Sequence, residues 1–371
     1  MGLIKKMKKF YGSAILVPEA LEKIIHANQQ IDSLRDRIEE ISLQKDESIR
    51  ALSQELDRQE KINELYFYTL FRDDDEEAEA MRKRFFRKVP KADGKTRLLQ
   101  KANAKLISDF DKICTDNKIE YWMCGGTLLG AVRNGGCIPW DDDIDVAMMR
   151  DEISKLREVL EKTDSEYTVT EFYQSWNLNK QLRFRPKAKA NPCFLDIFIY
   201  DYGTRAGEQE WQLWLEDKRR IIAEIHEKPV DAKFLDVLGV WSDEKTSLAR
   251  KVRGLFEEYY GGITGKRKEG GPGGVTNNPE LAKYVLWASD NFIPIANPQN
   301  SRIYDRDIVF PLKRIAYEGK ELLAPNDSDA FLRVSYGDYY RLPKDIVSHF
   351  QHVNLDELDV DLINEYINKE A

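Results

Sequence analysis

Apolar residues recur with a heptad period along the first part of the chain. No glycine or further proline follows Pro18 as far as residue 71, and proline suits the first turn of a helix. The repeating positions are Ile24, Ala27, Ile31, Leu34, Ile38 and Ile41, and after a slip at Lys45 they resume as Ile49, Leu52, Leu56, Ile62 and Leu65. A stutter in the repeat accommodates such a slip. The pattern predicts a coiled-coil helix over residues 19–72.

A helix of about 50 residues, at about 1.5 Å per residue, is longer than a domain is wide. It would bury its apolar stripe by oligomerising or by folding back on itself, and we expect homo-oligomerisation. The heptads leave the number and direction of the helices open.

Charged segments flank the predicted coiled coil. Residues 1–18 contain four lysines and no acid, so this basic segment either rests on an anionic membrane surface or is a plain soluble terminus. Residues 73–95 change from acidic to basic and contain Pro90 and Gly94, a pattern typical of a hinge.

Helical and extended patterns alternate over residues 96–352. Leu99, Ala102, Leu106, Phe110 and Ile113 share one helical face. Further elements are expected as strands over 121–124, 143–148 and 194–200, a helix over 208–225, an irregular loop or substrate lid over 266–280, and a hairpin at Glu318-Gly319 with strands over 307–317 and 320–323. This mixed order predicts an α+β fold of mixed α/β character. Residues 353–371 are expected to form an acidic tail or helix.

Composition excludes several classes of protein. The chain has 371 residues, 42% of them hydrophobic, and a net charge of −8, which argues against wholesale disorder and against a general nucleic-acid binder. Its four cysteines lack zinc-site spacing and fit a reducing compartment. No signal peptide or membrane-spanning run is visible. We expect a cytoplasmic protein, with any membrane contact peripheral and on the cytoplasmic face.

Four aspartates lie within five positions: Asp141, Asp142, Asp143 and Asp145. In a strand, residues two apart share a face, so Asp143 and Asp145 would point the same way and could bridge Mg²⁺ ions. Asp196, isolated in the apolar run FLDIFIY, would be a third metal ligand, or else a buried acid paired with an arginine. A solvated acidic loop remains the alternative for the whole run.

Possible phosphate contacts lie on either side of this acidic run. Gly125, Gly126 and Thr127 would let the backbone approach a phosphate where a helix begins, at about Thr127. Arg133 is either a phosphate clamp or part of a surface salt bridge. Arg183 and Arg185 share a face if residues 180–186 form a strand, and they either contact a phosphate or make structural ion pairs.

The segment GGTLLGAVRNGGCIPWDDDIDV, residues 125–146, resembles the signature of the LicD family of phosphotransferases, which includes the fukutin-related proteins. The segments FLDIFIYD, FPLKRIAYEGKELLAP and FLRVSYGDYYRLP are similar to that family as well, so the resemblance covers residues 96–352. Asn134 and Cys137 depart from the family pattern, which often has histidine and an aromatic residue there. We expect these departures to tune activity rather than abolish it.

The resemblance implies a nucleotidyltransferase-like core with a mixed β-sheet and added helices. It implies an enzyme that transfers phosphocholine, glycerol phosphate or ribitol phosphate from a CDP-linked donor to a sugar hydroxyl of a cell-surface polysaccharide, releasing CMP. Two Mg²⁺ ions, or Mn²⁺ in their place, would be held by Asp143, Asp145 and Asp196, and Asp196 could receive the acceptor proton. The alternatives are a nucleotidyltransferase that releases pyrophosphate and a non-catalytic coiled-coil scaffold.

Other residues of these motifs have less specific roles. Asp141 and Asp142 are expected to hold the loop or Trp140 in place. Tyr336 and Asp338 match a family motif in which we expect a tight turn. His349 and His352 form His-x-x-His, which lacks a third zinc ligand nearby, and His349 could instead lie near the acceptor.

Overall fold

The computed structural model describes residues 45, 47–59, 61–173, 180–188, 190–204, 212, 215–216, 219, 275–276, 278–287, 303–341 and 352–369. The chain divides into two compact units, residues 1–78 and 79–371, and each is described by itself. Within the described residues, no helix combines the length and the apolar character needed to cross a membrane.

In the first unit, the described residues up to 71 are helical, in agreement with the helix predicted there. This helix leaves large apolar side chains exposed, among them Leu52 (71%), Leu56 (57%) and Leu70 (76%). Residues 1–44 lie outside the described residues, and with them most of the predicted heptads and the basic segment. Coiled-coil association therefore stays a prediction.

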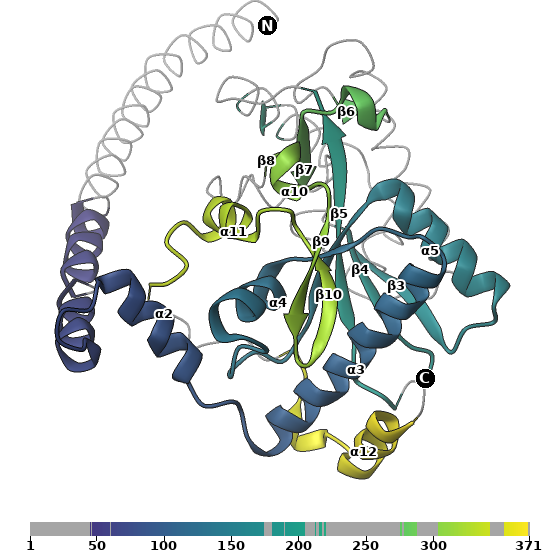
Figure 1. The fold of residues 1–371 in the computed structure, drawn as a ribbon, viewed down its shortest axis with the longest axis horizontal. Helices are drawn as coiled ribbons and strands as arrows, with labels where there is room; N and C mark the ends of the chain where they lie inside the picture. Colours follow the sequence, from purple (N-terminus) through teal and green to yellow (C-terminus); the bar gives the residue numbers. More distant parts are fainter. Residues whose placement is uncertain are drawn as a thin grey trace, which may run out of the picture. The chain divides into compact units, whose positions relative to one another are not determined.

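A mixed sheet forms the centre of the second unit (Figure 1). Its strand order is β1 (Trp122–Met123), β2 (Asp145–Met149), β5 (Leu195–Gly203), β4 (Lys180–Pro186) and β3 (Tyr167–Tyr173). β2 and β5 are parallel and pair Asp145 with Asp196, whereas the other neighbours along this path are antiparallel. The far end of β5 pairs with β6 (Val275–Thr276) and β7 (Tyr284–Trp287), and β7 pairs with β8 (Ile303–Asp305).

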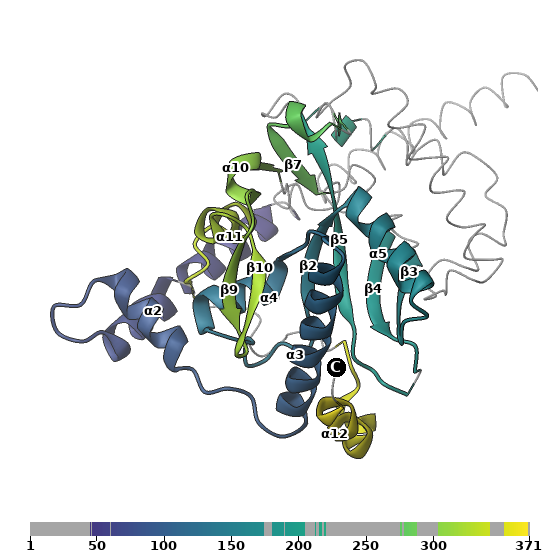
Figure 2. The same ribbon diagram turned by 45° about the vertical axis from the view of Figure 1, so that its right-hand side comes forward.

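Helices and a hairpin surround this sheet (Figures 1 and 2). From Ala78 on, the helices of the described residues are α2 (Ala78–Lys88), α3 (Gly94–Asp116), α4 (Gly125–Leu129), the π-helix η1 (Gly130–Asn134), α5 (Arg150–Lys162), η2 (Pro279–Leu281), α10 (Arg306–Val309), α11 (Ser328–Tyr336), η4 (Leu355–Glu357) and α12 (Val360–Asn368). The hairpin consists of β9 (Lys313–Tyr317) and β10 (Lys320–Ala324). α12, at the end of the described chain, packs on α3.

The structure confirms the mixed α/β fold and most of the predicted elements. Leu99, Ala102, Leu106 and Phe110 are fully buried on one face of α3. The hairpin turns at Glu318-Gly319 as expected, but residues 306–309 form α10, so its first strand begins at Lys313. The helix expected over 208–225 lies mostly outside the described residues. Within the loop expected over 266–280, β6 (Val275–Thr276) and the start of η2 (Pro279–Leu281) are regular, and residues 266–274 and 277 lie outside the described residues.

Three further features differ from those expected. α4 begins at Gly125 rather than at about Thr127, because the backbone turns there with a φ of +53° that favours glycine. β2 begins at Asp145, so Asp143 precedes the strand. The segment expected as a hinge contains α2, whose Phe86 is fully buried in the core, since its high charge conceals a few apolar positions.

Candidate metal centre

Three carboxylates converge at the start of the two central parallel strands. Asp143, Asp145 and Asp196 each offer an oxygen, and these oxygens lie within 4.8 Å of one another. Asp145 opens β2 and Asp196 is its register partner on β5, so adjacent strands present the two side chains on one face of the sheet. Asp143 joins them from the loop before β2. The structure thus brings together the three residues that the sequence proposed as metal ligands.

Asp196 also has an arginine partner. Its side chain is 4% exposed, with Arg183 Nε donating to Oδ1 at 2.7 Å and Gln181 Nε2 donating to Oδ2 at 2.7 Å. Burial raises the pKa of Asp196, and the charge of Arg183 opposes that rise. Arg183 in turn lies over the ring of Phe194, with 3.5 Å from Cζ to the centroid. Asp196 therefore belongs to the carboxylate cluster and also forms an ion pair with Arg183.

The Asp143 carboxylate is repelled by the neighbouring carboxylates. Burial raises the pKa of Asp143 well above its usual range, and the nearby charges of Asp145, Asp141 and Asp196 raise it further. A divalent cation among these oxygens would relieve that repulsion, and carboxylates are the ligands that hard cations prefer. The donor set therefore fits a metal ion.

Gly125 and Gly126 lie against the carboxylates. The Gly126 N–H donates to Asp145 Oδ2 at 2.9 Å. A Cβ added at Gly125 would lie 2.0 Å from Asp145 Oδ2, and one at Gly126 would lie 2.4 Å from Asp141 Oδ2. Thr127 is buried, and its hydroxyl accepts the Asp145 N–H at 2.7 Å. These residues position Asp145, and contact with donor phosphates stays a prediction.

Two arginines predicted to bind phosphate have protein partners. Arg133 is 3% exposed, lies over the Phe86 ring and donates from Nη1 to the Tyr339 carbonyl at 3.3 Å. Arg185 donates from Nη1 to the Pro186 carbonyl at 3.2 Å. Arg133 is thus a buried residue that packs on Phe86 and bonds the backbone of Tyr339. Its contact with a donor, like that of Arg185, stays a prediction.

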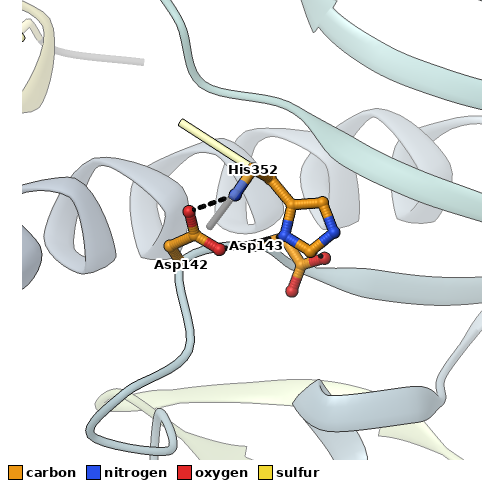
Figure 3. Close-up of side chains that lie close together, drawn as sticks. All are labelled: Asp142, Asp143 and His352. Atoms are coloured by element: carbon orange, nitrogen blue, oxygen red, sulfur yellow. Dashed lines mark hydrogen bonds and ion pairs between the residues drawn. The ribbon is translucent and has the colours of Figure 1, made fainter. Parts of the chain in front are cut away.

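The Asp142 carboxylate faces His352 in the C-terminal segment (Figure 3). Its Oδ2 accepts the backbone N–H groups of His352 at 2.8 Å and Val353 at 3.0 Å, and its Oδ1 lies 3.0 Å from His352 Nδ1. Burial opposes ionisation, but the hydrogen bonds from His352 and Val353 hold the pKa of Asp142 below its usual value. His352 Nδ1 also lies 3.4 Å from Asp143 Oδ2, so the C-terminal segment reaches the carboxylate cluster.

Sequence reasoning gave His352 no role beside the aspartates. The His-x-x-His spacing singled out His352 as a candidate, but it could not indicate the contact with Asp142, which lies 210 residues away in the sequence. With Asp142 and Asp143, His352 forms a second group whose ligand atoms lie within 4.8 Å of one another. His349 lies outside the described residues.

The main chain of the acidic loop is bonded to α3. Gln100 Nε2 donates to the carbonyls of Ile138 at 3.0 Å and Asp141 at 2.9 Å, and Asn103 Nδ2 donates to the Asp142 carbonyl at 2.9 Å. Trp140, in the same loop, is partly buried against the core. Gln100 and Asn103 thus help to hold the acidic loop. The sequence predicted this role for Asp141 and Asp142.

Tyr336 and Asp338 flank the turn that ends α11. Gly337 adopts a φ of +66° there, and Asp338 accepts the Tyr340 N–H and pairs with Arg82 at 2.6 Å. Tyr336 is 42% exposed. Their arrangement matches the tight turn expected for this motif.

Comparison with known proteins relates the residues around the three carboxylates to one family. Residues 118–236 match the family described as "LicD/FKTN/FKRP, nucleotidyltransferase domain". The lipopolysaccharide cholinephosphotransferase LicD of Haemophilus influenzae is 37% identical over 26% of this chain and 40% of its own length. The human ribitol 5-phosphate transferase FKRP is 26% identical over 28% of this chain and 21% of its own length.

These matches cover less than half the length of either relative. The family match nevertheless includes the glycine pair and all three clustered carboxylates, since residues 118–236 extend from before Gly125 to beyond Asp196. Residues 118–236 are therefore similar to the nucleotidyltransferase domain of the LicD/FKTN/FKRP family.

Proposed function

We propose that this protein is a Mg²⁺-dependent phosphotransferase that moves a phospho-alcohol group from a CDP-linked donor to a sugar hydroxyl of a cell-surface polysaccharide. One observation carries the proposal: Asp143, Asp145 and Asp196 converge inside a domain of this family. The relatives whose printed names are cholinephosphotransferase and ribitol 5-phosphate transferase support phosphocholine and ribitol phosphate as transferred groups. Glycerol phosphate remains a third choice.

In this reaction the acceptor oxygen attacks the phosphorus that bears the alcohol. The bond from that phosphorus to the bridging oxygen breaks, CMP leaves with the bond's electron pair, and the hydroxyl proton is released. A Mg²⁺ ion, or Mn²⁺, bound by Asp143, Asp145 and Asp196 would neutralise charge on the phosphate oxygens. We propose two ions at the site, because a pair of ions can neutralise charge on both the attacking and the leaving oxygen.

The protein's own residues would preorganise this centre. Gly126 and Thr127 fix Asp145 through its carboxylate and its backbone N–H. Arg183 and Gln181 fix Asp196 by bonding both of its oxygens. An ionised carboxylate has about four lone-pair sites, so Asp196 can keep these hydrogen bonds and still offer a lone pair to a cation or to the acceptor proton.

Product analysis tests the proposal and separates it from nucleotidyl transfer. The full chain with Mg²⁺ is incubated with CDP-choline, CDP-glycerol or CDP-ribitol and candidate glycans, and CMP is measured. We expect one donor to release CMP together with a modified glycan. Pyrophosphate release from CTP, with no CMP from any CDP-alcohol, would favour the nucleotidyltransferase alternative instead.

Asp143→Asn should abolish this turnover, because it removes a charged ligand from the cluster. It should leave the fold intact, since it relieves repulsion with Asp145 and Asp196. Asp151→Asn, an exposed position on α5, is the matched control and should keep wild-type turnover. Near wild-type CMP release by Asp143→Asn would contradict the metal assignment.

Two further parts of the proposal rest on sequence alone. We propose that the protein homo-oligomerises through the heptads of residues 19–72. We also propose that it is cytoplasmic and contacts the membrane peripherally through the basic residues 1–18.

A further inference from the structure

His352 enters the metal centre from a segment that is remote in sequence. Its Nδ1 lies between two carboxylates, 3.0 Å from Asp142 Oδ1 and 3.4 Å from Asp143 Oδ2. The imidazole also meets the Phe194 ring edge to face, with 6.2 Å between centroids. Phe194 supports Arg183, which pairs with Asp196, so His352 is packed into the same group of side chains.

Asp142 fixes the place of that imidazole. It accepts the backbone N–H groups of both His352 and Val353, and its own carbonyl is bonded by Asn103 from α3. Asp142 is therefore bonded on two sides, by α3 and by the C-terminal segment. Asp143 follows it directly, so its backbone has little freedom, and the orientation of its side chain remains to be set.

Repulsion works against a useful orientation of Asp143. The carboxylates of Asp145 and Asp196 would turn the Asp143 side chain away from the cluster in the absence of a cation. With Asp143 in its observed place, an oxygen within 4.8 Å of those of Asp145 and Asp196, His352 Nδ1 lies 3.4 Å from Asp143 Oδ2. An N–H donor at Nδ1 would hold the carboxylate in that place against the repulsion. A carboxylate held ready for the cation binds it more tightly, because less ordering is needed on binding.

We propose that Asp142 and His352 are a pair of positioning residues, in which Asp142 holds the imidazole and Nδ1 of His352 holds Asp143 in its cation-binding orientation. The inference rests on the proposed function, since it concerns the same cation. It predicts that the useful atom is Nδ1, and that an amide nitrogen placed there can replace it.

The test is Mn²⁺ binding to the full-length protein, measured by electron paramagnetic resonance and calorimetry without donor or acceptor. His352→Ala should weaken Mn²⁺ binding about 10-fold, as loss of a residue that orients a metal ligand commonly does. His352→Asn, whose Nδ2 takes the place of Nδ1, should bind nearly as well as wild type. His352→Gln, whose amide takes the place of Nε2, should resemble His352→Ala.

Asn364→Ala, at an exposed position on α12, is the control in the same C-terminal segment and should bind like wild type. Thermal melting of each variant separates a loss of fold from a loss of binding. A purely structural role for His352 would lower the melting temperature in step with affinity, and His352→Asn and His352→Gln would then not differ. Equal affinities for those two variants would overturn the proposal.

A double-mutant cycle tests whether the two residues act together. Asp142→Asn presents an amide to Nδ1 in place of a carboxylate, so it should weaken Mn²⁺ binding about as much as His352→Ala. The double variant should be no weaker than the weaker single variant, because both changes remove one arrangement. Fully additive losses would overturn the pairing.

Mn²⁺ binding by Asp143→Asn distinguishes a failure of this inference from a failure of the proposed function. If Asp143→Asn loses Mn²⁺ while His352→Ala keeps wild-type affinity, the positioning role is wrong and the metal centre stands. If wild type binds no Mn²⁺ or Mg²⁺, the metal part of the proposed function fails, and this inference fails with it.

Discussion

At the scale of single residues, the lack of a Cβ at Gly125 makes room for the Asp145 carboxylate. Gly125 combines a φ of +53° with close contact to Asp145, because an added Cβ would lie 2.0 Å from Oδ2. The Gly-Gly pair was noticed in the sequence as a possible phosphate contact. In the structure it first makes room for a carboxylate, a long-range contact that the local sequence could not predict.

Gly125→Ala should therefore weaken cation binding as well as stability. A left-handed backbone costs a non-glycine residue about 1–2 kcal/mol, and the clash with Asp145 adds to that cost and displaces the carboxylate. Gly94 is a matched control, because it also has a φ of +53° but an added Cβ would meet nothing within 4 Å. Chemical denaturation and Mn²⁺ binding should show that Gly94→Ala loses stability only. Equal Mn²⁺ affinities in the two variants would contradict this account.

At the scale of elements, the side chain of Glu318 bonds the β9–β10 hairpin to the loop before the acidic run. Glu318 is 6% exposed, pairs with Arg97 Nη2 at 2.6 Å and accepts the Cys137 N–H at 2.9 Å. Burial works against its ionisation, but Arg97, the Cys137 N–H and Lys91 together lower the pKa of Glu318 to about 2. The hairpin thereby fixes the turn at Gly136, whose added Cβ would lie 2.4 Å from Glu318 Oε1.

The ionised form of Glu318 should stabilise the fold in a defined pH range. Its pKa falls from 4.5 to about 2 on folding, so its contribution is complete above pH 4.5 and is lost as pH falls toward 2. The shift corresponds to at most about 3 kcal/mol. The free energy of unfolding of Glu318→Gln should thus fall below that of wild type at pH 7, and the gap should close toward pH 2.

Glu321→Gln, at an exposed position in the same hairpin, is the control and should follow wild type at every pH. A gap between Glu318→Gln and wild type that stays constant from pH 7 to 2 would show that packing, and not charge, explains the effect of Glu318.

The elements that could be predicted are those whose pattern is local. The buried face of α3 has a period of 3.6 residues, and the hairpin has a turn at Glu318-Gly319. The carboxylate cluster also followed from sequence, because strand patterns placed Asp145 and Asp196 in two buried strands. The contacts of Glu318 with Cys137 and of Asp142 with His352 span 181 and 210 residues, and no local pattern encodes such pairings. α2 was missed because its charges outnumber its apolar residues.

At the scale of the whole molecule, the first unit exposes large apolar side chains to water, which is energetically unfavourable. Ile49, Leu52, Leu56 and Leu70 are each more than half exposed. Ile49, Leu52 and Leu56 are spaced by three and four residues, and Leu70 follows two heptads after Leu56, so the four side chains share one helical stripe. Such a stripe is stabilised by packing against a partner helix. We expect the protein to assemble through this helix into a multiple of its 43.2 kDa chain.

Leu52→Asp/Leu56→Asp should dissociate that assembly, because burying two new charges in a helical interface costs more than the interface gains. Light scattering coupled to gel filtration measures the mass directly. Ala51→Asp/Gln54→Asp adds the same two charges at exposed positions of the same helix that lie off the stripe, and it should keep the wild-type mass. Mn²⁺ affinity should be the same in all three proteins, since the carboxylates belong to the second unit. A wild-type mass of a single chain, or equal dissociation in both double variants, would contradict assembly through the stripe.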